Sequence, residues 1–323
     1  VAHFDTNRGE ARVVMYHYVR PSPDRPPHGY YHLSLSDFRQ QLEYFADRDG
    51  FVEREAFVEF LRGDRTAPAG VVLTFDDALI DHYEWVLPEL RRRDLWGLFF
   101  VPTGPFVHGR VLPVHRIHSL VGSVPARELR RELESVLDAD PSVLDGADSV
   151  AGAYGEQSSG ADVSEFKRLL NFIVAPESVH EVLDRVERRI TGYDAPSVSE
   201  YYLSETQLVE MADAGMLFGA HSVTHPVLSR LGEDEQHAEV TSSVTWLANR
   251  VGPQPVSTFA YPYGGQETYT DATVDALVDG GCDAAFTTES GVTTADSRRV
   301  SPFGLPRRDC NEFEHGGATF DLP

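Results

Sequence analysis

The stretch GVVLTFDD, residues 70–77, joins a short apolar run to two adjacent carboxylates. An apolar run of this kind is typical of a β-strand. Asp76 and Asp77 follow it directly, which places them at the carboxyl edge of a parallel sheet, where α/β proteins keep their functional sites. Because neighbouring side chains on an extended backbone point apart, the two carboxylates can take different roles. The alternative is that one of them only caps a following helix.

Other apolar runs along the chain are also typical of strands. Helical patterns separate them, at Tyr83–Arg93, at Ser243–Val251 and at Thr270–Asp279. This alternation favours a parallel sheet, arranged either as a barrel or as a doubly wound sheet. The predicted strands besides residues 70–75 are Arg12–Tyr16, Gly97–Val101, Met216–Ala220 and Ser257–Tyr261.

Polar residues predict where two helices begin. Ser36 is expected to cap a helix whose apolar residues, Phe38, Leu42 and Phe45, follow at helical spacing. Residues 204–207, SETQ, have the pattern of a capping box and predict the start of another helix.

The pattern changes between Pro102 and Tyr202. Pro, Gly and Ser cluster around residues 142–160, and amphipathic helices are expected on both sides of this cluster. We therefore predict a single domain over residues 1–323, with a mostly helical insertion at residues 103–202.

The charge of the chain limits its partners. It has 28 basic and 51 acidic residues, a net charge of −23, which repels nucleic-acid phosphates and anionic lipids.

No run approaches the roughly 18 apolar residues that span a bilayer, so no transmembrane segment is expected. Residues 1–10 lack the basic and apolar regions of a signal peptide, which predicts a cytoplasmic location, although the missing initial Met leaves a trimmed leader open. The oligomeric state is not predicted.

Two histidines stand four residues apart in GAHSVTHP, residues 219–226. At this spacing His221 and His225 can face one point, as zinc sites require. Ser222 and Thr224 between them can support such a site through hydrogen bonds. Since the pair comes directly after a predicted strand, a metal site is favoured over a structural role.

A third stretch, FAYPYGG at residues 259–265, follows another predicted strand. Gly264 and Gly265 allow close approach of the backbone to a ligand, and a main-chain N–H near Tyr263 could face a developing oxyanion. A strand that ends in an aromatic turn explains this stretch equally well when it is taken alone.

Together, TFDD, HSVTH and FAYPYG, in this order, resemble the signature motifs of the polysaccharide deacetylase family, the fourth carbohydrate esterase family. The resemblance covers roughly residues 13–101 and 203–288 and leaves out the predicted insertion. It implies a distorted, incomplete (β/α) barrel. It also implies a divalent metal, with zinc expected and cobalt, nickel or manganese as alternatives.

The resemblance assigns roles by position. Asp77, His221 and His225 match the metal ligands, and Asp76 matches the catalytic base. The backbone N–H of Tyr263 matches the group that stabilises the oxyanion. The predicted contacts with the substrate are Tyr261, Pro262, Gly264 and Arg307.

The chain also departs from the family pattern. MYHYV, residues 15–19, is similar to a motif in a subset of the family whose motifs are permuted. In that subset such a histidine is the general acid, which makes His17 the candidate for this role. The alternative is that His17 has a purely structural role in the barrel. Ala260 stands where many members carry an Arg that pairs with the base, and Arg307 or Arg308 is a candidate replacement.

The resemblance implies a metal-dependent hydrolase that removes an acetyl or other small acyl group from an N-acylated sugar or saccharide. The alternatives are an amide hydrolase that acts on a non-sugar small molecule, and a carbohydrate-binding protein that has lost catalysis. Two histidines and a carboxylate also form the facial triad of non-haem iron oxygenases. Those sites usually carry the carboxylate two residues from the first histidine on a β-sandwich, a pattern that this chain lacks.

Overall fold

The computed structural model describes residues 9–21, 31–64, 66–144 and 161–317. These residues divide into two compact units. Unit 1 contains residues 9–21, 32–64, 66–110 and 201–317, and unit 2 contains Tyr31 with residues 111–144 and 161–200. The predicted boundaries, one domain with an insertion at residues 103–202, stay a prediction.

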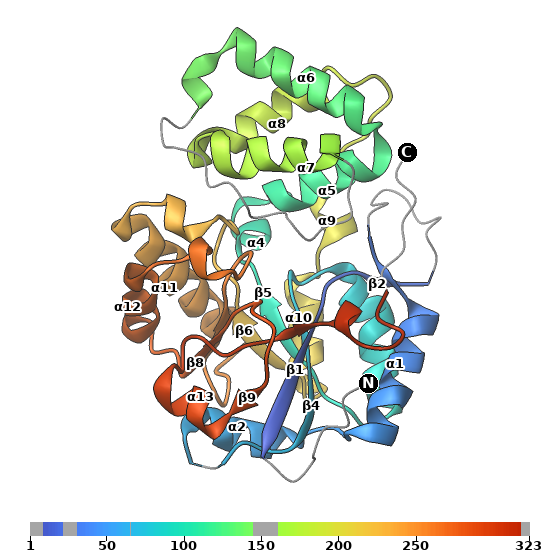
Figure 1. Cartoon of the computed structure of the whole chain (residues 1–323), viewed down its shortest axis with the longest axis vertical. Helices are drawn as coiled ribbons and strands as arrows, with labels where there is room; N and C mark the ends of the chain where they lie inside the picture. The colour runs from blue at the N-terminus through green and yellow to red at the C-terminus, as the bar shows by residue number, and fades with distance from the viewer. Residues whose placement is uncertain (1–8, 22–30, 65, 145–160, 318–323) are drawn as a thin grey trace. The chain divides into compact units, whose positions relative to one another are not determined.

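Unit 1 is built on a parallel sheet with the strand order β10-β1-β4-β5-β6-β7-β8, and β9 pairs antiparallel with β1 (Figure 1). A separate pair, β2 (Val19–Arg20) and β3 (Leu33–Ser34), is also parallel. The strands of the main sheet are β1 (Glu10–Tyr16), β4 (Gly70–Phe75), β5 (Leu98–Val101), β6 (Leu217–Ala220), β7 (Thr258–Ala260), β8 (Ala284–Phe286), β9 (Thr293–Thr294) and β10 (Arg308–Asp309).

Strands β8 and β1, which lie at opposite ends of the series β1-β4-β5-β6-β7-β8, both pair with the same chain segment, residues 305–309. Leu305 forms a parallel bridge with Phe286 of β8, and β10 pairs with β1 only a few residues later. A segment that contacts both edges requires the sheet to curl. The predicted fold class, a distorted and incomplete (β/α) barrel, is confirmed.

Helices follow most strands of unit 1 (Figure 1). A π-helical turn, His82–Val86, precedes α3, and short 3₁₀ turns lie at Leu228–Arg230, Gln266–Thr268 and Cys310–Glu312. The helices are α1 (Leu35–Arg48), α2 (Arg54–Arg62), α3 (Leu87–Arg92), α4 (Gly104–His108), α10 (Glu205–Asp213), α11 (Glu233–Arg250), α12 (Asp271–Asp279) and α13 (Ala295–Val300).

Strand residues alternate between two apolar cores, as the period of a strand requires. Phe75 and Phe99 contribute to one core together with apolar side chains of α1. Val72 and Phe100 contribute to the other, together with side chains of α2. Because burial of a phenylalanine stabilises the folded state by about 1.5–3 kcal/mol, these cores hold the strand ends in place.

The helix starts that the sequence predicts are partly confirmed. Ser204 caps α10 in a capping box with Gln207, as expected. The prediction of Ser36 as a cap is wrong, because Ser34 has the extended backbone of a cap and its Oγ accepts the N–H of Asp37 at 3.0 Å. The helix at Ser243–Val251 begins ten residues earlier than expected, at Glu233, since its cap is Gly232, which carries no side-chain signal.

Unit 2 is mostly helical in its described part. Arg116 of α5 is buried and pairs with Asp184 at 2.7 Å and with Glu187 at 2.7 Å, which ties α5 to α8. Its helices are α5 (Pro113–Ser123), α6 (Ala126–Ala139), α7 (Ala161–Arg168), α8 (Val179–Glu187) and α9 (Val198–Tyr201), with 3₁₀ turns at Pro141–Val143 and Pro176–Ser178 and a π-helical turn at Leu169–Ile173.

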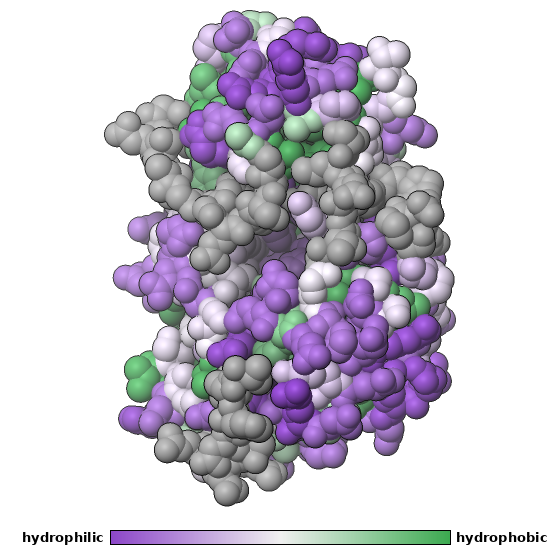
Figure 2. Space-filling view, turned by 45° about the vertical axis from the view of Figure 1, so that its right-hand side comes forward, coloured by the Kyte–Doolittle hydropathy of each residue, from purple (hydrophilic) through white to green (hydrophobic). Residues whose placement is uncertain are grey.

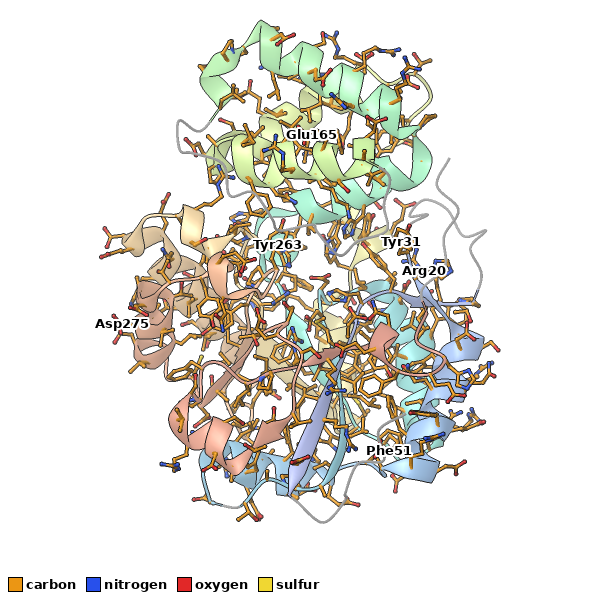
Figure 3. The ribbon with its side chains drawn as sticks, in the orientation of Figure 1. Arg20, Tyr31, Phe51, Glu165, Tyr263 and Asp275 are labelled. Carbon is orange, nitrogen blue, oxygen red and sulfur yellow. The ribbon has the colours of Figure 1, made fainter. Side chains whose placement is uncertain are left out.

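The described surface is mostly hydrophilic on the face shown in Figure 2. Large hydrophobic side chains that are exposed, such as Val209, Val278 and Val300, are scattered along the chain. Acidic residues such as Asp275 lie on the exposed side of α12 (Figure 3). Within the described ranges, every helix is too short or too polar to cross a membrane.

Candidate metal and catalytic site

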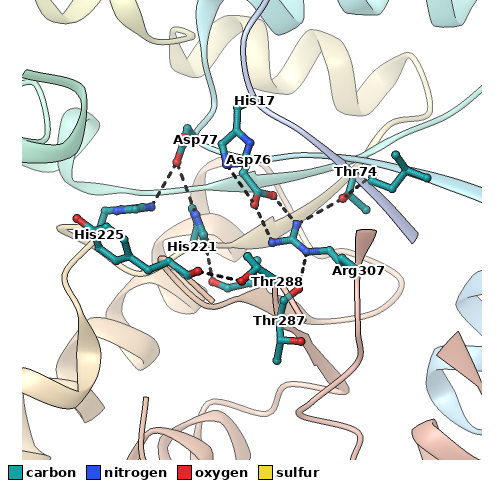
Figure 4. A network of polar contacts seen from close by, with 12 residues as sticks. His17, Thr74, Asp76, Asp77, His221, His225, Thr287, Thr288 and Arg307 are labelled. Carbon is teal, nitrogen blue, oxygen red and sulfur yellow. Dashed lines mark hydrogen bonds and ion pairs between the residues drawn. The ribbon is translucent and has the colours of Figure 1, made fainter. Parts of the chain in front are cut away.

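The two carboxylates of β4 lie where the strand ends and the chain turns. The N–H of Asp76 still donates to the carbonyl of Tyr16 in β1, at 2.9 Å, so Asp76 continues the ladder of the sheet. Asp77 and Ala78 then have φ angles of 81° and 51°, which non-glycine residues rarely adopt. This turn gives the two buried carboxylates different partners (Figure 4).

Asp77, His221 and His225 form one buried group (Figure 4). The Nε2 atoms of His221 and His225 lie 3.6 Å and 3.5 Å from Oδ1 of Asp77. One donor atom from each residue lies within 4.8 Å of the other two. Two imidazoles and a carboxylate at this spacing are a donor set that fits a divalent metal such as zinc.

Hydrogen bonds orient the first histidine toward this group. Nδ1 of His221 lies 2.7 Å from the carbonyl oxygen of Ala260, which can only accept, so Nδ1 carries the proton and Nε2 presents a lone pair. Burial lowers the pKa of His221 against the opposing effect of Asp76 and Asp77. A neutral imidazole with a fixed tautomer is the form that binds a metal.

The loop between the histidines is strained and tightly held. Ser222 and His225 have φ angles of 62° and 58°, and the N–H of His225 donates to Oγ of Ser222 at 3.0 Å. Thr224 donates through its hydroxyl to Glu239 of α11 at 2.6 Å. The expectation that Ser222 and Thr224 engage in supporting hydrogen bonds therefore has a structural basis, whereas Glu239 had no recognisable signal in the sequence.

Asp76 forms a bidentate ion pair with Arg307. Nη1 and Nη2 of Arg307 lie 2.7 Å from Oδ1 and 2.7 Å from Oδ2, and Nε donates to the carbonyl of Thr287 at 3.1 Å. Burial by itself would raise the pKa of Asp76, but the Arg307 guanidinium opposes this effect, and the pKa lies below its usual range. The carboxylate is therefore held as an anion.

Many family members carry an Arg that pairs with the base, and this chain has Ala260 at that position. Arg307, one of the two candidate replacements, pairs with Asp76. Its guanidinium is fully buried and occupied by Asp76, Thr74 and Thr287. This geometry favours a role in holding the base over the predicted contact with the substrate, which stays a prediction.

His17 joins the same group from the other side of Asp76. Its Nε2 lies 3.9 Å from Oδ2 of Asp76, and its side chain is 40% exposed. The carbonyl oxygen of His17 accepts a hydrogen bond from Nε2 of the buried His82, at 3.0 Å. The structure thus places the candidate acid beside the candidate base, with its imidazole accessible to a ligand.

In the stretch after β7, Tyr263 lies next to the candidate metal ligand His225. The ring of Tyr263 lies 5.2 Å from that of His225, and φ of Tyr263 is 61°. Gly264 must be a glycine, because an added Cβ would come within 2.5 Å of Thr288 Cγ2 and 2.8 Å of its backbone nitrogen. Pro262 and Gly264 are buried.

Tyr261 lies deeper than a substrate contact would require. Its ring stacks on Tyr269 with centroids 3.9 Å apart, and its hydroxyl donates to the carbonyl of Phe303 at 2.8 Å. Both the ring and the hydroxyl of Tyr261 therefore contact other residues of the protein. The predicted roles of Tyr261, Pro262 and Gly264 in substrate binding stay predictions.

The sequence model of the polysaccharide deacetylase family matches residues 176–285, which include both histidines and Tyr263. No curated protein matches the chain. The family match and the fold support a carbohydrate deacetylase activity. The resemblance of residues 15–19 to a subset of the family stays a prediction.

Solved structures, two of them described as deacetylases, share the fold over most of the chain. PplD of Streptococcus pyogenes, a deacetylase in complex with acetate, aligns with a TM-score of 0.55 and 20% identity over 93% of this chain and 92% of its own. IcaB from Ammonifex degensii aligns with a TM-score of 0.53 and 19% identity over 92% of each chain. The deacetylase domain of BpsB from Bordetella bronchiseptica aligns with a TM-score of 0.53 and 15% identity over 94% of this chain and 97% of its own. The family match over residues 176–285 and this shared fold together confirm the resemblance of the chain to the polysaccharide deacetylase family.

Proposed function

We propose that this protein is a metal-dependent hydrolase that removes an acetyl or other small acyl group from an N-acylated sugar or saccharide. The observation that carries the proposal is the convergence of the Asp77–His221–His225 group with the Asp76–Arg307 pair and His17. The family match and the shared fold point to the same activity. A cytoplasmic location stays a prediction.

The proposed metal ligands are Asp77, His221 and His225. Their buried nitrogen and oxygen donors suit zinc, and cobalt, nickel and manganese accept similar donors. Three protein ligands would leave positions on a bound metal for water and substrate, as in catalytic zinc sites. A bound divalent metal supplies Lewis-acid chemistry, which lowers the pKa of a water and polarises a carbonyl.

The remaining residues account for the movement of protons. Asp76, held as an anion by Arg307, accepts the proton of the attacking water. The backbone N–H of Tyr263 is proposed to donate to the carbonyl oxygen as negative charge develops on it. His17, accessible and beside Asp76, is proposed to protonate the leaving amine nitrogen.

The test is the release of acetate from a panel of N-acetylated sugars, measured with and without added metal. Asp76→Asn should retain the metal and lower turnover about 10²- to 10⁴-fold, the usual contribution of a general base. Asp77→Ala should lose both metal and turnover. Asp275→Asn, a matched change on the exposed side of α12, should leave both unchanged.

Other outcomes would redirect the proposal. Loss of metal in Asp76→Asn would exchange the roles of the two aspartates. Affinity for a sugar without release would indicate a binding protein that has lost catalysis. Stoichiometric metal with no release from any sugar, but hydrolysis of a simple non-sugar amide, would indicate the small-molecule alternative.

A further inference from the structure

One carboxylate outside the site motifs holds the loop that carries both histidines. Oε2 of Glu239, in α11, accepts the N–H groups of Val223 and Thr224 at 2.7 Å and 2.8 Å. Its Oε1 accepts the hydroxyl of Thr224 at 2.6 Å. Hydrogen bonds to an ionised carboxylate are shorter and stronger than neutral ones. Glu239 therefore binds the middle of the His221–His225 loop at three points.

Backbone hydrogen bonds hold the other side of this loop. The N–H of Thr103 donates to the carbonyl of Ser222 at 3.1 Å, and the N–H of Gly104 donates to that of Val223 at 2.7 Å. The loop is thus held between the start of α4 and Glu239. Left-handed backbone is unfavourable at non-glycine residues such as Ser222 and His225, so it persists only where surrounding contacts enforce it.

We propose that Glu239 is a positioning residue for the metal pair, which sets the spacing of the His221 and His225 imidazoles around Asp77. This inference rests on the proposed metal site. A shift of the loop would move His225 relative to His221, because His221 is separately fixed by β6 and by its bond to Ala260. Glu239 bonds Val223 and Thr224 between the two ligands, and removal of groups that orient metal ligands typically changes the affinity for the metal 10- to 100-fold.

A purely structural role makes a different prediction. If Glu239 only anchors α11 to the sheet, its loss would lower the melting temperature and leave the metal site of the folded protein unchanged. Affinity and ligand geometry must therefore be measured on folded protein. The d–d absorption of Co²⁺ reports that geometry directly and needs no substrate.

The experiment uses the full chain, stripped of metal by a chelator and titrated with Zn²⁺ against a competing indicator, and separately with Co²⁺. In Glu239→Ala we expect the Kd for Zn²⁺ to rise about 10- to 100-fold, with a changed Co²⁺ spectrum. Glu239→Gln should raise the Kd less, about 3- to 10-fold, below the usual 10- to 100-fold loss, because its amide oxygen can still accept both backbone N–H groups. Glu233→Ala, which removes an exposed glutamate from the same helix, should bind like the parent protein.

The measured Kd and Co²⁺ spectrum distinguish a positioning role of Glu239 from a purely structural one. A Kd within twofold of the parent and an unchanged Co²⁺ spectrum in Glu239→Ala would overturn the positioning role while the proposed function stands. Should the Ala variant not fold, an unchanged Kd and spectrum in Glu239→Gln would overturn it equally. Failure of the parent protein to bind either ion would overturn the proposed metal site and this inference together.

Discussion

Arg307 shows how a single buried side chain can define the chemical state of a neighbour. It lies 231 residues from Asp76 along the chain and outside the matched motifs, yet both carboxylate oxygens of Asp76 pair with it. The segment that pairs with both β8 and β1, residues 305–309, brings it there. Burial raises the pKa of Asp76, whereas Arg307 lowers it and so favours the ionised form, which can accept a proton.

Arg307→Met should therefore lower the free energy of unfolding by about 3–5 kcal/mol, because it leaves a buried carboxylate without its partner. The double variant Asp76→Asn/Arg307→Met should regain part of this loss. Urea unfolding at pH 7 measures both. Arg299→Met, a control on an exposed arginine of α13, should change stability by less than about 0.5 kcal/mol; an equally small effect of Arg307→Met would contradict the argument.

At the scale of elements, α3 is tied to α1 through Glu89. This buried carboxylate accepts hydrogen bonds from Arg39 of α1 at 2.8 Å and from Arg92 at 2.6 Å, and it also pairs with Arg93. Burial would raise the pKa of Glu89, but the hydrogen bonds from these arginines lower it to about 2. The folded pKa thus lies below the unfolded value, so the ionised form stabilises the fold.

This sign fixes the dependence on pH. The contribution of Glu89 is present above about pH 4.5 and is lost as the pH falls toward 2. Since Arg39 and Arg92 are about half exposed, solvent screens the pairs, and we expect Glu89→Gln to destabilise the protein by about 1–2 kcal/mol at pH 7.

Urea unfolding of Glu89→Gln and the parent protein between pH 7 and pH 3 measures the effect. The difference between the two should shrink through the acid range. A difference that does not change with pH would contradict the assignment. Glu233→Gln, a control at an exposed position of α11, should change the free energy of unfolding very little at any of these pH values.

At the scale of the whole molecule, the net charge of −23 opposes compaction. Many arginines are engaged in exposed ion pairs, which contribute little individually. Repulsion among the excess carboxylates should therefore outweigh these pairs at low ionic strength.

We expect the melting temperature to rise as NaCl is increased from 10 mM to 0.5 M, because the screening length falls from about 30 Å to below 8 Å. Differential scanning calorimetry at pH 7 measures it, with choline chloride as a control for effects specific to sodium. A melting temperature that falls with added salt would mean that the ion pairs contribute more than the repulsion.

Local patterns in the sequence were sufficient for the parts of the fold that depend on near neighbours. The apolar period and the polar ends identified β4 and the capping box of Ser204, and the order of the three motifs pointed to the three residues that the structure brings together as a candidate metal site. Where the local signal was ambiguous or absent, the prediction failed. Ser34 and Ser36 are both residues that can cap a helix, and Gly232, the cap of α11, has no side chain that would mark the start of a helix.

The sequence by itself therefore determined which strand ends carry the acidic and imidazole groups, because a strand and the turn after it are encoded within a few residues. Only the tertiary structure decided which groups support them. Arg307 reaches Asp76, His17 lies beside it, and Glu239 holds the histidine loop because the sheet curls and α11 packs against it. Such contacts depend on how distant segments register in three dimensions, which no periodicity along the chain records.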